Sequence, residues 1–191
     1  MSIEQSKEAA KAMHTSTYRA ILLTIYTDSL GIDNKIGAAT YTTSHTLYQH
    51  FEIDIQHNVY VRELIAIGLT ISIACRQQAK ECNIYMNSQA AVKALTNSRR
   101  QSGQEIIKAT LDNIDYATLE LKMKLSVHWI PGYLQIKGNN EANKEAKKAA
   151  RDPTLSKNFS HSPMKLAWKM AIKCLTKTQQ QTLTTMATTA K

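Results

Sequence analysis

The order of strand-like and helix-like segments constrains the fold of this 191-residue chain most strongly. Three strand-like segments come first: an apolar run at 22–26 that ends in a polar turn at 27–29, then 36–41 and 47–55. Their short, turn-rich links are typical of antiparallel strands. Strands then alternate with helices, which indicates parallel pairing. The order predicts an α/β fold with a mixed five-stranded sheet, three antiparallel strands and then two parallel ones, flanked by helices.

Turn and capping residues define the elements of the second part of the chain. The segment at 60–75 has both a helical spacing of apolar residues and strict alternation, so its apolar pattern fits a helix or a strand. Its length favours a helix, whereas its β-branched residues favour a strand. The other expected elements are a strand at 83–86, a helix capped by Ser88, a helix at 104–121, a strand at 125–130 stopped by Pro131-Gly132, and an Ala-rich helix from Gly138 to about Arg151.

The segments at both ends of the chain are polar. We interpret residues 1–20 as a polar leader outside the core, 21–151 as one domain, and 152–191 as a linker with a tail helix at 164–175. The 6 glycines and 3 prolines are too few for a collagen-like or linker-rich protein. With 43% hydrophobic residues, wholesale disorder is also excluded.

Charge and cysteine content limit the partners and the compartment. Lys and Arg number 24 against 15 Asp and Glu, a net charge of +9, which allows a nucleic acid or another anionic partner without identifying one. The 3 cysteines lack a CxxC pair, so they predict a reducing intracellular location, cytoplasm or nucleus. There is no apolar signal segment, and no apolar run reaches the roughly 20 residues of a membrane span. We therefore expect no membrane partner.

Four segments, taken in order, resemble the type 1 ribonuclease H domain. They read IYTDS at 25–29, VRELIAI at 61–67, IYMNSQAAVKAL at 84–95 and WIPGYLQIKGNNEANKEAKKAA at 129–150. The likeness covers about residues 20–151 and is greatest to the C-terminal domain of LINE-type retroelement polyproteins of filamentous fungi. The resemblance implies a ribonuclease H-like fold and an RNA–DNA hybrid as partner, whose RNA strand the enzymes of the family hydrolyse. It also implies a former place in a polyprotein with a reverse transcriptase.

The same resemblance implies the residues of an active site. In the family, acidic side chains hold two Mg²⁺ or Mn²⁺ ions about 4 Å apart, which activate water and stabilise the leaving oxyanion. Asp28 and Glu63 match two of these acids and are the catalytic and metal-binding candidates. Asn87 and Asn143 occupy positions where the family has aspartates, and Tyr133 replaces a histidine that shuttles a proton.

These departures predict that catalysis is impaired or lost. An amide offers a dipole where the site needs a full charge, and the two losses together imply roughly 10⁴-fold weaker activity. Glu141 is not expected to replace the acid missing at 143, because residues two apart on a helix point about 200° away from each other. Binding of Mg²⁺ or Mn²⁺ is predicted to be weak or absent.

The departures also share a pattern at the level of codons. Asp to Asn, His to Tyr and Glu to Lys can each arise from one C-to-T change, and the sequence shows them at Asn87, Asn143, Tyr133 and Lys148. This pattern is the basis of the hypothesis that the chain is a retroelement copy degraded by C-to-T mutation.

Three functions stay open at this point. The chain is a ribonuclease H-type endonuclease, a non-catalytic protein that binds RNA–DNA hybrids, or a decayed retroelement fragment without function. Arg99, Arg100 and Lys108 are candidate phosphate contacts, although charge clusters usually form solvated faces. We expect the protein to be a monomer.

Overall fold

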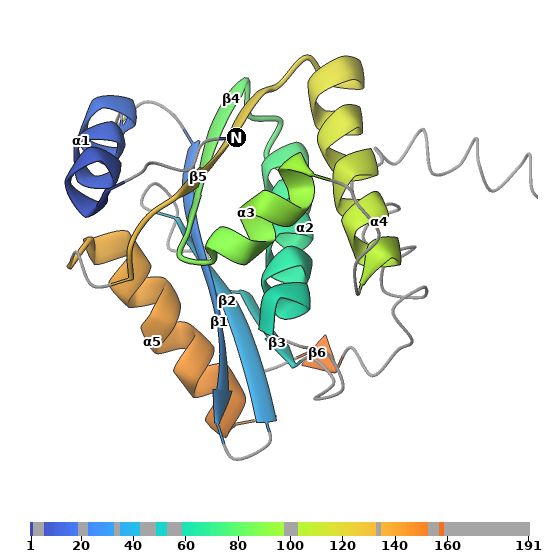
Figure 1. Cartoon of the computed structure of the whole chain (residues 1–191). Helices are drawn as coiled ribbons and strands as arrows, with labels where there is room; N and C mark the ends of the chain where they lie inside the picture. Colours follow the sequence, from blue (N-terminus) through green and yellow to red (C-terminus); the bar gives the residue numbers. More distant parts are fainter. Residues whose placement is uncertain are drawn as a thin grey trace, which may run out of the picture.

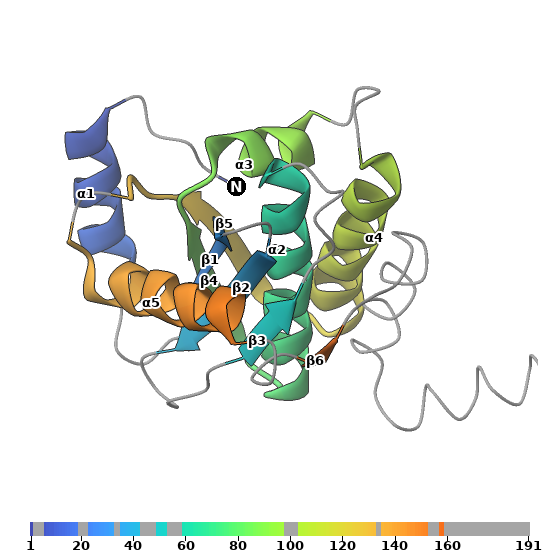
Figure 2. The same cartoon turned by 90° about the horizontal axis from the view of Figure 1, so that it is seen from below.

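In the computed structural model, the described residues form one sheet with helices on both faces (Figures 1 and 2). They are residues 1, 6–18, 23–32, 35–42, 49–52, 59–97, 103–132, 135–152 and 157–158. None of the helices within these ranges is long and apolar enough to cross a lipid bilayer.

The sheet has the strand order β5-β4-β1-β2-β3-β6. The strands are β1 (Leu23–Ile32), β2 (Lys35–Thr42), β3 (Gln49–Glu52), β4 (Glu81–Met86), β5 (Lys124–Trp129) and β6 (Lys157–Asn158). β1, β2 and β3 pair antiparallel, while β4 is parallel to β1 and β5 is parallel to β4. This confirms the predicted mixed sheet. The two residues of β6, from the expected linker, add a parallel strand beside β3.

Two groups of helices cover the two faces of the sheet (Figure 2). The helices are α1 (Lys7–Thr17), α2 (Val59–Arg76), α3 (Gln89–Thr96), α4 (Gln104–Asp115), the π-helical turn η1 (Tyr116–Glu120) and α5 (Lys137–Arg151). α2, α3 and α4 lie on one face, and α1 and α5 lie on the other. The larger core cluster lies under α2, α3 and α4.

The segment whose pattern fitted both helix and strand is helix α2. Leu64, Ile65, Ile67, Ile71 and Ile73 are all almost completely buried. They cannot all lie on one stripe of a helix, so α2 is apolar on several sides because it is enclosed by the sheet and by α3 and α4. Because α2 is enclosed on several sides, apolar residues also occupy the alternate positions that resembled a strand in the sequence.

Strand β1 is longer than the sequence predicted. The expected turn at 27–29 is wrong, because β1 continues to Ile32 and pairs with β2 as far as Lys35. Asp28 and Ser29 are polar residues inside a strand, with exposed fractions of only 2% and 9%. They resemble turn residues in sequence because they are polar, yet their side chains contact other elements.

The interpretation of the N-terminal segment as a leader outside the core is also wrong for the part that the structure describes. Ala10 of α1 is fully buried, and Met13 packs against the smaller core cluster, which includes Tyr26 and Tyr85. The domain boundaries at 20 and 152 remain predictions. The expected tail helix at 164–175 lies outside the described residues.

Helix α5 approaches the sheet so closely that two positions admit only glycine. A Cβ at Gly37 of β2 would lie 2.1 Å from the Ala146 carbonyl oxygen and 2.4 Å from the Ala150 nitrogen. A Cβ at Gly138 would lie 2.2 Å from the ring of Tyr26. The backbones of α5 and β2 are therefore in direct contact.

Replacing Gly37 by alanine should force α5 away from the sheet. For Gly37→Ala we expect the free energy of unfolding in a urea titration to fall by about 3 kcal/mol or more, because the clash is with backbone atoms that cannot rotate away. Gly132→Ala is the matched control, since its Cβ would meet nothing closer than 3.8 Å. Equal effects of the two changes would contradict the close contact.

Candidate active site

The centre of the candidate site lies where strand β4 ends beside β1. Thr27 is the last residue of β1 that pairs with β4, opposite Met86, so Asp28 and Asn87 are the next residues along their strands. The carboxyl ends of parallel strands are common places for binding sites. Here Asn87 Nδ2 donates a hydrogen bond of 3.1 Å to Asp28 Oδ1.

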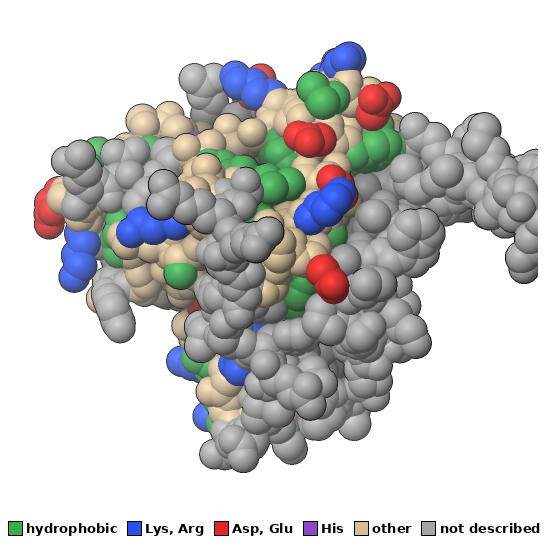
Figure 3. Space-filling model, turned by 45° about the vertical axis from the view of Figure 1, so that its right-hand side comes forward, with side chains coloured by type: hydrophobic (Ala, Val, Ile, Leu, Met, Phe, Trp, Pro, Cys, Tyr) green, Lys and Arg blue, Asp and Glu red, His purple; other side chains and the backbone are tan. Residues whose placement is uncertain are grey.

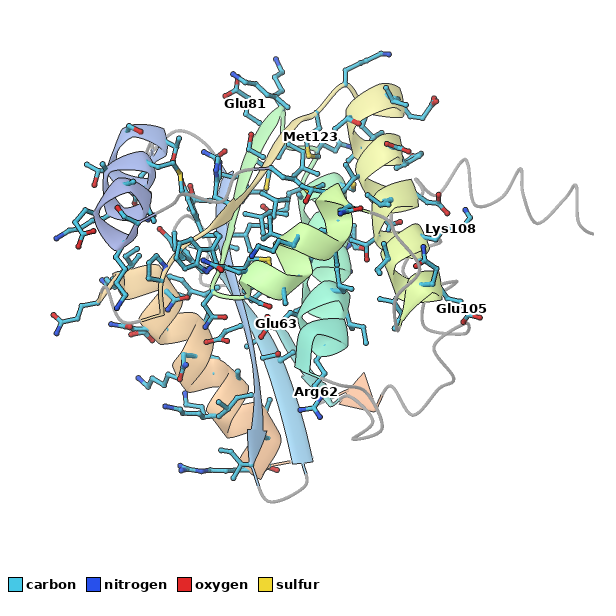
Figure 4. All side chains as sticks on the ribbon, viewed as in Figure 1. Arg62, Glu63, Glu81, Glu105, Lys108 and Met123 are labelled. Atoms are coloured by element: carbon cyan, nitrogen blue, oxygen red, sulfur yellow. The ribbon has the colours of Figure 1, made fainter. Side chains whose placement is uncertain are left out.

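Glu63 reaches the site from helix α2 through Ser29. The Ser29 hydroxyl donates a hydrogen bond of 2.5 Å to Glu63 Oε1, and the Ser29 amide donates to Asp28 Oδ1 at 2.8 Å. Glu63 lies on the β1 side of α2, whereas Arg62 points away from the site (Figure 4). Adjacent residues of β1 therefore connect the two carboxyl groups, each only 2% exposed.

Asn143 and Lys147 bring helix α5 to the same site. The side-chain amide of Asn143 and the positive charge of Lys147 both lower the pKa of Asp28. These two residues are one helical turn apart, so they share a face of α5. The structure thus brings together Asp28, Glu63, Asn87 and Asn143 from four separate elements.

Burial opposes ionisation of both carboxyl groups. Loss of solvent raises the pKa of Asp28 despite hydrogen bonds from Asn87, Asn143 and Ser29 and the nearby charge of Lys147. Burial and the neighbouring Asp28 charge raise the pKa of Glu63 to about 8. Burial and the Asp28 charge together therefore favour the protonated form of Glu63 at neutral pH.

The comparisons with known proteins identify the family. The model of the RNase H family, described as RNase H, matches residues 12–151. The chain belongs to the RNase H family. A search of curated proteins finds no match to this RNase H domain.

Several solved structures share its fold at low sequence identity. LC11-RNase H1, isolated from compost by a metagenomic approach, matches with a TM-score of 0.53 and 19% identity, over 71% of this chain and 99% of that one. The foamy viral protease-reverse transcriptase in complex with dsDNA matches with 0.51 and 16%, over 67% and 93%. The N-terminal RNase H domain of a Mycobacterium tuberculosis protein, fused to maltose-binding protein, matches with 0.50 and 16%, over 68% and 99%. These likenesses support the fold.

The donor atoms of this RNase H domain do not fit the two-metal centre that the resemblance implies. Asp28 Oδ2 and Glu63 Oε2 are buried without a hydrogen-bond partner, as oxygen ligands of a cation would be. However, within the part of the chain that the structure describes, no group of three or more His, Cys, Asp or Glu side chains is placed to hold a metal ion. Two carboxyl groups supply too little negative charge for two divalent ions.

The other candidates lie elsewhere or outside the described residues. Tyr133, Arg99 and Arg100 are among the residues that the structure does not describe. Lys108 lies on α4, away from Glu63, and forms an exposed ion pair of 2.8 Å with Asp112 (Figure 4). Figure 3 shows acidic and basic side chains interspersed on this side of the molecule. The nucleic-acid role of these three basic residues therefore stays a prediction.

Ser29 and Lys147 are site residues that the sequence reasoning missed. Alternation along β1 places Ser29 on the opposite side of the strand from Asp28, which is where Glu63 lies. Lys147 follows Asn143 by four residues on a helix, a spacing that puts both on one face. Glu141, by contrast, pairs with Lys144 at 3.9 Å, as expected for a side chain directed away from the site.

Ionisation of Glu63 should make the RNase H domain less stable as the pH rises. Because the pKa of Glu63 is about 8 in the folded state and lower when unfolded, its protonated form stabilises the fold fully below about pH 4.5. That contribution is lost as the pH rises to about 8. Glu63→Gln should flatten this dependence and raise the free energy of unfolding at pH 9 by about 2 kcal/mol.

Urea titrations from pH 5 to pH 9 measure this difference. Glu141→Gln is the matched control, because it removes an acid of α5 that lies outside the carboxyl pair. The same pH dependence in wild type and Glu63→Gln would contradict the assignment.

Proposed function

We propose that this RNase H domain has a degenerate catalytic centre, so that hydrolysis of the RNA strand of an RNA–DNA hybrid is impaired or lost. The observation that carries this proposal is the hydrogen bond from Asn87 Nδ2 to Asp28 Oδ1. The resemblance implies an aspartate at position 87, whose carboxylate would hold a metal ion together with Asp28.

The orientation of the Asn87 amide opposes metal binding. A metal ligand must direct an oxygen lone pair at the cation, whereas Asn87 directs its NH₂ group at Asp28. Turning the amide over would remove this hydrogen bond and bring two oxygen atoms together. The pair is therefore stable without a cation.

Charge also opposes metal binding at the site. Carboxyl groups must lose their protons before they bind a metal ion, and both Asp28 and Glu63 have a raised pKa. The positive charge of Lys147 acts on Asp28 and would repel a divalent cation. Asn143 adds a second amide where the resemblance implies an acid.

Restoring the two acids should restore cleavage of a labelled RNA–DNA hybrid in Mg²⁺ or Mn²⁺. For Asn87→Asp combined with Asn143→Asp we expect activity at least about 100-fold above wild type, since each ligand contributes 10-fold or more. Asn140→Asp is the matched control, because it makes the same change at an exposed position of α5. We expect it to leave activity at the wild-type level.

Two results would contradict the proposal. The first is wild-type activity within tenfold of an RNase H domain with all four acids. The second is a double variant that folds, as judged by circular dichroism, and cleaves no better than Asn140→Asp. The latter would show that the amides at 87 and 143 are not what limits catalysis.

We also propose that the domain derives from a retroelement polyprotein. The support is the shared C-to-T pattern of Asn87, Asn143, Tyr133 and Lys148. The nucleotide sequence tests it: AT-biased codons and loss of the mutable C contexts are expected, and ordinary codon usage would overturn it.

Hybrid binding separates the remaining candidates. A net charge of +9 supports binding to a polyanion, and such binding weakens at higher salt because the counterions that it releases then gain less entropy. Salt-dependent binding without cleavage would favour a non-catalytic binding protein. No binding at low salt would favour a decayed fragment without function.

A further inference from the structure

One face of the sheet is polar and aromatic where β5, β4 and β1 lie side by side. Alternate residues of the three strands form two rows across this face, Thr24, Asn83 and Ser126 in one and Tyr26, Tyr85 and His128 in the other. The opposite face is apolar at the neighbouring positions Ile25, Ile84 and Val127. A sheet face of this kind is not a surface for an apolar helix.

Helix α1 covers this face through polar contacts. His14 Nε2 lies 2.8 Å from the Tyr26 hydroxyl, and the Thr17 hydroxyl lies 2.7 Å from the Tyr85 hydroxyl. The Asn83 amide donates a hydrogen bond of 3.0 Å to the Thr17 carbonyl oxygen. Three contacts, made by His14 and Thr17, therefore hold the C-terminal half of α1 on strands β1 and β4.

The ring of His14 completes a cluster of aromatic side chains under α1. Tyr85 stacks on Tyr26 at 5.2 Å and on His128 at 5.3 Å between ring centres. His14 lies above them, 4.8 Å from the Tyr85 ring. Since Tyr26 and Tyr85 are 2% or less exposed, α1 is part of what shields them from solvent.

We propose that the polar face of β1, β4 and β5 is a docking surface for helix α1 and that protonation of His14 releases the helix. In the docked state His14 Nε2 and the Tyr26 hydroxyl share a hydrogen bond of 2.8 Å. Tyr26 keeps its proton because burial raises its pKa. Protonation of His14 makes both ring nitrogens donors and places a positive charge among buried rings.

Burial favours the neutral form of His14. The titratable groups that face it are Tyr18 of its own helix, Tyr26 of β1, Tyr85 of β4, His128 of β5 and, beside His128, the amino group of Met1. Burial lowers the pKa of His14, and burial together with the Met1 and His14 charges lowers that of His128 to about 4. Docking is therefore strongest above pH 6.5 and weakens as the pH falls below it.

Release of α1 would uncover a surface that continues into the candidate site. Tyr26 and Tyr85 precede Asp28 and Asn87 by two residues on the same strands, so their side chains lie on the same face. The docked helix thus limits the surface that a ligand can reach beside Asp28. This inference holds whether or not the domain cleaves RNA.

Hydrogen exchange of the full chain, followed by mass spectrometry and corrected for the intrinsic pH dependence, tests the proposal. Between pH 7 and pH 5 we expect the protection of α1 amides to fall about tenfold, while that of α2 amides does not fall. His14→Phe keeps the ring contacts but cannot be protonated, so its α1 protection should change less than about threefold over this range. Lys11→Gln removes an exposed charge of α1 and should behave as wild type.

His14→Gln is the second variant, because it keeps a hydrogen-bond acceptor and also lacks the charge. Constant α1 protection in wild type from pH 7 to pH 5 would overturn the proposal. Loss of α1 and α2 protection together would also overturn it, since that result shows unfolding of the domain. Retention of the full pH dependence in both variants would exclude His14 as the titrating group.

Discussion

The contact between helix α5 and strand β2 sets the geometry on which the candidate site depends. At Gly37 the backbones meet without space for a methyl group, and small residues of α5 make this approach possible. The buried residues on that side of the helix include Ala142, Ala146, Ala149 and Ala150. The close approach of α5 to the sheet brings Asn143 and Lys147 near Asp28. Larger side chains in the contact would move two of the groups that act on that carboxyl.

Burying the two carboxyl groups of the site costs free energy, and the stability of the fold does not require it. Asp28 and Glu63 are buried, each has one oxygen without a hydrogen-bond partner, and burial disfavours their charged forms. Such groups gather at functional sites, where a ligand satisfies them. In this chain the Asn87 amide and Ser29 satisfy one oxygen of each carboxyl instead. The arrangement is that of a ligand site in which the protein's own side chains provide part of the hydrogen bonding that a ligand would provide.

Sequence patterns predicted the sheet well and the contacts of polar residues poorly. The antiparallel and parallel pairing followed from short links and from the alternation of strands with helices. The four residues that the family resemblance assigned to one site, Asp28, Glu63, Asn87 and Asn143, lie close together in the structure. The turn expected at 27–29 was wrong because composition does not show that a polar residue has a buried partner. Helix α1 was taken for a leader because its contacts to the sheet are polar. Apolar periodicity gives no signal for a helix held in this way.

Replacing an acid by an amide at position 87 affects stability and catalysis in opposite directions. An aspartate there would face Asp28 across about the 3.1 Å that now separates Asn87 Nδ2 from Asp28 Oδ1, and only a cation would offset the repulsion. The amide removes that repulsion and adds a hydrogen bond, so the fold without a metal ion gains stability. It also removes the charge that would attract a metal ion. Under the proposed loss of an acid at position 87, a domain of the RNase H family keeps its fold while its active site loses a donor that hydrolysis requires.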